Sequence, residues 1–222
     1  MADAFRTQVH YDDDLNLATK LLPICRETLE QIEYNDNYPF GKTSFYNQDV
    51  FTEILNKYPE QFSELKKFIL NTVKMHVHYH GFDDDKINFG LTSIWLSQMN
   101  KGGYHELHHH LPGPHLSGNF FINSDKNSSN LTFVRTADEV SHRYCFPEDL
   151  PKRKGKDWDN LYSVVEKEFE PVIGRMYVFN SNILHKVKPN KSDDRICISF
   201  NISMYKENEA WIVYEISLLV LL

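Results

Sequence analysis

Apolar residues near the start of the chain recur at the spacing of an α-helix. Behind Asp14, which suits an N-cap, they follow at intervals of three and four positions: Leu17, Leu21, Cys25, Leu29 and Ile32. This spacing predicts an amphipathic helix, in which Pro23 introduces a kink or marks the start of a second helix. A clearer helix is predicted from Pro59 to about His80, because Pro suits the first helical position and Gly81 the position beyond the end.

The pattern changes after Gly81 to short runs rich in β-branched and aromatic residues, with Gly, Pro, Asn and Asp between them. The runs are LTSIWLSQM (91–99), SGNFFIN (117–123), NLTFV (130–134), RMYVFN (175–180), ILHKVKP (183–189) and RICISFNISMY (195–205). Short strands with turn signals between them predict an antiparallel sandwich or barrel. The polar stretch 33–49 is predicted to be a loop, and the charged stretch 136–170 a long loop for which we hypothesise a role as a lid.

These patterns predict one domain over residues 1–222. Its parts are a helical front (10–82), a β-sandwich core (88–205) and an apolar C-terminal tail (207–222). The last twelve residues, WIVYEISLLVLL, contain Glu215 and are fewer than the roughly 20 needed to cross a bilayer. They predict a closing strand, a helix packed on the core, or a contact between the subunits of a homodimer.

Charge and cysteine content narrow the class of protein. The net charge of −7 argues against binding to nucleic acid or to an anionic membrane, and the short basic run at 152–156 is predicted to be a solvated loop. Three widely spaced cysteines, Cys25, Cys145 and Cys197, predict thiols in a reducing compartment and no disulfide framework. The polar N-terminus has no signal-peptide pattern, so a cytoplasmic location is expected.

Candidate chemistry centres on GGYHELHHHLPGPHLSG (102–118), which holds five of the eleven histidines. If this segment is extended, residues i and i+2 share a face, so one such pair presents two imidazoles to a common point. His108 and His110 form such a pair, and His109 then faces the opposite side. Imidazole ligands suit several transition metals, although a run of histidines also occurs as plain surface polarity or adventitious metal binding.

A second signal lies downstream, where His185 is followed ten positions later by Arg195 at the start of a strand. An arginine inside RICISF is costly to bury unless it meets an anion. The alternative is an ion pair at the surface with Asp193 or Asp194. The ordered set of His-x-His, a distant His and then Arg favours a functional site.

At this point the sequence resembles the Fe(II)- and 2-oxoglutarate-dependent dioxygenases, and within them a branch of small oxygenases common in marine bacteria and their phages. The matching segments are SIWLSQMNKGG, YHEL, HHH, LSGNFFI, VFNSNILH and DDRICISFNI, and the resemblance extends over roughly residues 10–205. It implies a mainly β fold with N-terminal helices and a double-stranded β-helix core, the cupin-like jelly roll. It also implies oxidative decarboxylation of 2-oxoglutarate to succinate and CO2, coupled to hydroxylation of a substrate C–H bond.

The resemblance implies site residues as well. His108, His110 and His185 would hold the Fe(II), and Arg195 would bind the distal carboxylate of 2-oxoglutarate. In the family, the His-x-His pair stands at a set distance after a Gly-Gly turn and before a Ser-Gly pair. The distance from Gly103 selects His108 and His110, whereas the distance back from Ser117 selects His109 as the first ligand and Leu111 as the second. Since Leu cannot ligate, a one-residue insertion reconciles the counts, and His109 remains the alternative.

The chain departs from the wider superfamily at two points. A histidine stands where most members have the carboxylate of a two-His, one-carboxylate triad, which makes the site less electron-rich. Glu106 could lie just behind the ligands. Cys197 replaces a serine two residues after the arginine, and Ser199, on the same strand face, could supply the missing hydroxyl.

Two other functions are alternatives for a β-sandwich with these histidines: a cupin-type metalloenzyme and a non-enzymatic binding protein. A cupin-type metalloenzyme requires a Glu shortly after the second His, and LPGPHLSG has none. A non-enzymatic metal-binding or protein-binding β-sandwich has no need of a buried arginine after the third His. The sequence leaves the substrate open between a small molecule and a peptide.

Overall fold

The computed structural model describes residues 9–134, 166–206 and 220–221. Its helices are α1 (Leu15–Gln31), α2 (Gln48–Lys57), α3 (Pro59–Tyr79) and the short 3-10 helix η1 (Asp84–Lys86). The first predicted helix is confirmed, because the Asp14 side chain accepts a hydrogen bond from the Leu17 amide at 2.8 Å as its N-cap. The helix continues through Pro23, so no second helix starts there. The second predicted helix is confirmed as α3, and Gly81 follows its end at φ +84°.

Helix α2 corrects the prediction of a loop over 33–49, into which its first residues fall. Its apolar side chains Phe51, Ile54 and Leu55 have helical spacing and are fully buried. The run is short and follows a segment rich in Asn, Asp and aromatic residues, so its period was not apparent. The stripe forms a helix because it packs against α1 and the underlying sheet.

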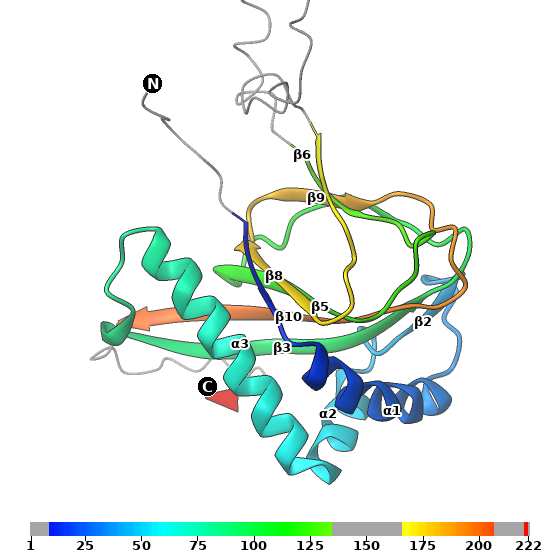
Figure 1. Ribbon diagram of the computed structural model, residues 1–222, viewed down its shortest axis with the longest axis horizontal. Helices are drawn as coiled ribbons and strands as arrows, with labels where there is room; N and C mark the ends of the chain where they lie inside the picture. The colour runs from blue at the N-terminus through cyan, green and yellow to red at the C-terminus, as the bar shows by residue number, and fades with distance from the viewer. Residues whose placement is uncertain (1–8, 135–165, 207–219, 222) are drawn as a thin grey trace, which may run out of the picture.

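Two antiparallel sheets form the β part of the molecule (Figure 1). The larger has the order β1-β8-β5-β10-β3-β11, with β2 also paired to β3, and the smaller has the order β4-β9-β6-β7. The strand bounds are β1 His10–Asp13, β2 Gly41–Thr43, β3 Ile87–Met99, β4 His105–His108, β5 Leu116–Asn123, β6 Leu131–Val134, β7 Glu166–Phe169, β8 Arg175–Asn180, β9 Leu184–Val187, β10 Arg195–Lys206 and β11 Val220–Leu221.

The structure confirms the six predicted strands and adds others. Strand β1 forms the first residues of the predicted helical front (10–82), and β7 lies inside the stretch predicted to be a loop over 136–170. Both are short and polar, and their register comes from pairing with β8 and β6 rather than from local pattern. The hypothesised lid, the basic run and Cys145 lie outside the described residues. In the tail, Val220–Leu221 pairs with β3, as expected of a closing strand.

Alternation along the strands of the larger sheet separates the core from the site. On β10, Ile196, Ile198, Phe200 and Ile202 pack in the layer shared with the helices, which cover the outer face of this sheet (Figure 1). The intervening residues therefore face the smaller sheet, across the interior of the sandwich. The period of two thus turns a polar set of side chains inward: Arg195, Cys197, Ser199 and Asn201.

The described helices include none that is long and apolar enough to cross a membrane. Cys25 and Cys197 are buried free thiols, in agreement with the prediction from cysteine spacing.

His76 on α3 makes the stability of the metal-free protein depend on pH. The side chain is 1% exposed, its Nε2 lies 3.2 Å from Asn180 Oδ1, and burial lowers its pKa to about 4. Between pH 6.5 and 4 the unfolded chain therefore binds more protons at this residue, so stability falls as the pH falls through that window. Urea unfolding should show wild type losing about 2 kcal/mol more than His76→Gln from pH 7 to 5. Equal losses in the two proteins would contradict this assignment.

Candidate active site

Three histidines converge at one end of the smaller sheet. His108 ends β4 and lies opposite His185 on the neighbouring strand β9. His110, two residues further, is held by a hydrogen bond from its amide to the Ser181 carbonyl at 2.9 Å. One side-chain nitrogen from each of the three residues lies within 4.8 Å of the other two. The structure thus brings together the three histidines for which the sequence predicted a ligand role.

Hydrogen bonds fix the tautomer of each ring in this triad. Nδ1 of His108 donates to the Glu106 carbonyl at 2.7 Å, and Nδ1 of His185 donates to the Ile183 carbonyl at 2.9 Å. Nδ1 of His110 lies 2.8 Å from Asn201 Oδ1. Because carbonyl and amide oxygens only accept, each Nδ1 carries the proton and each Nε2 keeps a free lone pair.

A second contact fixes the amide of Asn201, and with it the ring of His110. Asn201 Nδ2 donates to Ser93 Oγ at 2.8 Å, which turns its Oδ1 toward His110. Ser117 Oγ lies 2.8 Å from the same His110 nitrogen. Polar groups behind an imidazole hold its orientation in metal sites, and this arrangement is of that kind.

Two other histidines of the segment, His109 and His115, take no part in the triad. His109 is exposed, and its Nδ1 accepts a hydrogen bond from the Leu111 amide, so its ring does not join the triad. His115 likewise accepts from the Met204 amide at 3.0 Å. His109 lies between two residues of the triad and faces away from them, as the alternation of an extended chain predicts. Strand β4 ends at His108, so alternation does not extend to His115.

Arg195 lies in the same pocket as the triad, a cavity of about 740 Å³. Its side chain is 3% exposed; Nε donates to the Ser129 carbonyl at 3.0 Å, and the guanidinium stacks over Phe121 with its Cζ 4.9 Å from the ring centroid. Among the described residues no carboxylate forms an ion pair with it. A permanently charged guanidinium buried without an anion is costly, so the pocket has the charge needed to attract an anionic ligand.

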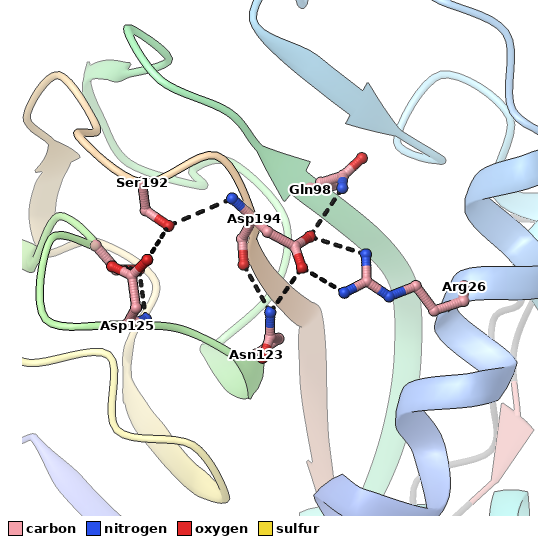
Figure 2. A network of polar contacts seen from close by, with 7 residues as sticks. Arg26, Gln98, Asn123, Asp125, Ser192 and Asp194 are labelled. Carbon is pink, nitrogen blue, oxygen red and sulfur yellow. Dashed lines mark hydrogen bonds and ion pairs between the residues drawn. The ribbon is translucent and has the colours of Figure 1, made fainter.

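The alternative of a surface ion pair between Arg195 and its aspartate neighbours is wrong for Asp194. The Asp194 carboxylate points the other way, where it accepts hydrogen bonds from Arg26, from Gln98 at 2.9 Å and from Asn123 at 2.8 Å (Figure 2). It thereby ties helix α1 to strands β3 and β5. These contacts lower the pKa of Asp194, although burial acts against them.

Ser199 and Tyr38 are two of the hydroxyl-bearing residues that line this pocket with Arg195. Ser199 Oγ accepts from Asn119 Nδ2 at 2.7 Å, which leaves its own proton free to donate, and it lies 3.9 Å from Cys197 Sγ. Tyr38, which the sequence did not single out, has a buried hydroxyl with no hydrogen-bond partner in the described parts of the chain. Burial raises the pKa of this hydroxyl while nearby Arg195 acts to lower it.

His105 also lines the pocket. Its ring centroid lies 5.6 Å from that of Tyr38 and 6.1 Å from that of His108, so it bridges the arginine end and the triad end of the pocket. Burial, with a smaller contribution from Arg195, lowers its pKa to about 3. It is therefore a neutral ring at physiological pH.

Burial also favours the neutral, ligating form of two rings of the triad, those of His110 and His185. It lowers the pKa of His185 to about 3, and it lowers the pKa of His110 despite the hydrogen bond to Asn201. Neutral imidazoles with free Nε2 atoms are the form that binds a transition metal. The residues present thus fit a divalent metal.

Comparison with known proteins identifies the family. The sequence profile described as "Putative 2OG-Fe(II) oxygenase" matches residues 93–201, a range that contains the triad and Arg195. The chain belongs to the 2OG-Fe(II) oxygenases. This oxygenase therefore uses Fe(II) and 2-oxoglutarate, and the cupin-type and non-enzymatic alternatives are set aside. A search of curated proteins finds no match.

Solved structures show that this oxygenase has the family's jelly-roll fold. A prolyl-4-hydroxylase of Pseudomonas putida aligns over 89% of this chain and 93% of that one, with 13% identity and a TM-score of 0.50. The carbocyclase SnoK of nogalamycin biosynthesis aligns over 88% and 79%, with 12% identity and a TM-score of 0.56. HygX of Streptomyces hygroscopicus, solved with nickel, 2-oxoglutarate and hygromycin B, aligns over 89% and 83%, with 10% identity and a TM-score of 0.50. The branch of marine bacteria and phages stays a prediction.

Proposed function

We propose that this oxygenase holds Fe(II) through Nε2 of His108, His110 and His185 and binds 2-oxoglutarate between that metal and Arg195. The observation that carries the proposal is the shared pocket. Three free imidazole nitrogens and one buried guanidinium, for which the described part of the chain offers no counter-ion, open into the same cavity. A dicarboxylate with a 2-oxo acid group at one end offers a chelating group to the metal and an anion to the arginine.

Arg195, Ser199 and Tyr38 form the proposed site for the distal carboxylate. A guanidinium binds a carboxylate through two parallel N–H groups. Nε of Arg195 donates to the Ser129 carbonyl, and Nη1 makes only a long contact of 3.9 Å with Cys197 Sγ, so the two terminal nitrogens have no strong partner in the described residues and are available to the ligand. Ser199 has a free hydroxyl proton because Asn119 occupies its oxygen. The buried Tyr38 hydroxyl gains the partner that it otherwise lacks.

The all-histidine triad alters the charge balance of the site. Three neutral imidazoles leave both positive charges of Fe(II) uncompensated, whereas a triad with a carboxylate leaves one. A dianionic co-substrate therefore supplies the missing negative charge itself. We expect this site to depend more on 2-oxoglutarate for tight metal binding than a site with a carboxylate ligand does.

The contribution of the chain to the reaction is positional. The bound iron and 2-oxoglutarate supply the oxidation itself, in which oxidative decarboxylation to succinate and CO2 accompanies hydroxylation of a substrate C–H bond. Asn201, Ser117 and the two backbone carbonyls hold the imidazoles in a fixed orientation. Trp95 and Leu131, both buried, exclude water from the pocket walls. Glu106 supports His108 through its backbone carbonyl and not through its carboxylate.

The substrate is proposed to be a small molecule or a peptide side chain. The acidic net charge of −7 supports the exclusion of nucleic acid as a substrate and fits a cytoplasmic enzyme. The neighbours named above act on or bind different compounds, so we take no individual substrate from them.

The reaction is tested by succinate formation in the absence of a primary substrate. Purified protein with Fe(II), ascorbate and 2-oxoglutarate should release succinate slowly, because such enzymes turn over their co-substrate without coupling. The rate should vanish when zinc replaces iron, since zinc has no redox chemistry. Absence of both 2-oxoglutarate binding and succinate formation in the iron-loaded protein would refute the proposal.

A further inference from the structure

Aromatic side chains surround the mouth of the pocket. Phe40, Phe45, Tyr46 and Tyr104, which we call the aromatic rim, line the cavity and are 43–52% exposed. They form two pairs, Phe45 with Tyr46 at a centroid distance of 5.3 Å and Phe40 with Tyr104 at 6.5 Å. Four large rings left open to water at the mouth of one cavity indicate a surface that binds a ligand.

Buried aromatic contacts connect this rim to the triad. The Phe45 ring lies 5.3 Å from Trp95 in an edge-to-face arrangement, and the Trp95 ring lies 6.2 Å from His110. Trp95 is only 8% exposed. A ligand that packs against Phe45 therefore lies beside aromatic side chains that extend as far as the metal ligand His110.

Few of the residues that line the pocket carry a formal charge, and the positive and negative residues differ in burial. Apart from histidines, Arg195 and Glu106 are the charged residues among the described lining. Arg195 is buried and is assigned to the co-substrate. Glu106 is exposed on β4, and no ion pair of its carboxylate is found in residues 9–134 and 166–206. Once 2-oxoglutarate is bound, the remaining charge on the substrate side is negative.

Ring faces and a carboxylate select the same kind of ligand. The face of an aromatic ring carries negative electrostatic potential and attracts a cation within about 6 Å. A carboxylate does so through its full charge, whereas an anionic substrate would find no partner there. We propose that the substrate of this oxygenase presents an ammonium or alkylammonium group to the aromatic rim and Glu106. This inference rests on the proposed function, because it places the substrate beside the Fe(II) and 2-oxoglutarate site.

The test compares three probes of similar shape and different charge. Choline carries a trimethylammonium group, 3,3-dimethylbutan-1-ol is its neutral isostere, and 3,3-dimethylbutanoate is an anion. The protein is loaded with Mn(II) and 2-oxoglutarate, and paramagnetic relaxation of the methyl protons of each probe is titrated. Choline should bind about fivefold more tightly than the alcohol or better, and the anion should not compete with it.

Variants assign the selectivity to residues. Glu106→Gln should bring the ratio of choline to alcohol affinity toward one, and Phe45→Leu should weaken choline more than the alcohol. Glu53→Gln, an exposed acid on α2, and Phe82→Leu, an exposed aromatic beyond α3, are the matched controls, because neither lines the pocket. They should leave the ratio unchanged.

The same samples separate the two proposals. Relaxation of the 2-oxoglutarate protons by Mn(II) reports whether the co-substrate binds beside the metal. If 2-oxoglutarate relaxes and the alcohol binds as tightly as choline, or the anion binds best, the cationic substrate is refuted and the proposed function stands. If 2-oxoglutarate does not relax, the proposed function fails first.

Discussion

Replacement of Arg195 by methionine is expected to abolish tight 2-oxoglutarate binding and, at the same time, to stabilise the ligand-free protein. The two effects have one cause, a buried charge that has no ion-pair partner in residues 9–134 and 166–206 and that the co-substrate would neutralise. Loss of the paired N–H donors should cost about 3 kcal/mol of binding, roughly a 100-fold weaker Kd. Removal of the uncompensated charge should raise the free energy of unfolding of the ligand-free protein by about 1–3 kcal/mol.

The experiment pairs calorimetric titration of 2-oxoglutarate with urea unfolding. Metal content should not change, since Arg195 contacts none of the three histidines. Arg26→Met is the matched control, because Arg26 is the partner of Asp194, the residue just before Arg195 (Figure 2). That variant should lose stability and keep its affinity for 2-oxoglutarate. Equal loss of metal and co-substrate in Arg195→Met, or of neither, would contradict the role given.

Alanine substitutions of the histidines should separate those that bind the metal from those that do not. His108→Ala, His110→Ala and His185→Ala should each weaken Fe(II) or Mn(II) binding by more than the roughly 10–100-fold that loss of an outer hydrogen-bond partner costs. His109→Ala should have no effect, since its exposed ring accepts only the Leu111 amide. The measurement is metal affinity by competition with a chelator of known affinity.

Further variants distinguish loss of a metal ligand from loss of metal caused by misfolding. His185 is 5% exposed, so its glutamine variant is measured beside the alanine variant, with circular dichroism of each. Asn201→Ala keeps all three ligands and should fall between wild type and His110→Ala, because it frees the His110 ring without removing it. A loss of metal in His109→Ala as large as in His108→Ala would restore the alternative register counted back from Ser117.

The parts of the site that depend on local periodicity could be predicted from the sequence. Alternation along an extended chain placed His108 and His110 on one face, and the cost of burying a charge identified Arg195. The same alternation on β10 could have identified Asn201, a polar residue six positions after Arg195 and therefore on its face.

Other parts of the site have no local signal. Tyr38 and Phe45 lie in a segment predicted only as a loop, and they reach the pocket because Gly41–Thr43 pairs with the end of β3. His105 is separated from Arg195 by 90 residues and faces it only after the two sheets close. Helix α2 and strand β7 likewise take their form from tertiary partners. Contacts between distant segments decide such features.

The loop between α1 and α2 contributes to the pocket but lies outside the part of the chain that matches the family. It supplies Tyr38, Phe40, Phe45 and Tyr46 to the pocket, yet it lies before the range 93–201 that defines the family. His108, His185 and Arg195 lie on β-strands and His110 lies two residues beyond β4, whereas most of the aromatic rim lies on the connection between two helices. Such connections tolerate changes of length and composition better than strands do. If the rim binds the substrate as proposed, substitutions in this one short connection should change which compounds the pocket accepts and leave the histidines and the arginine in place.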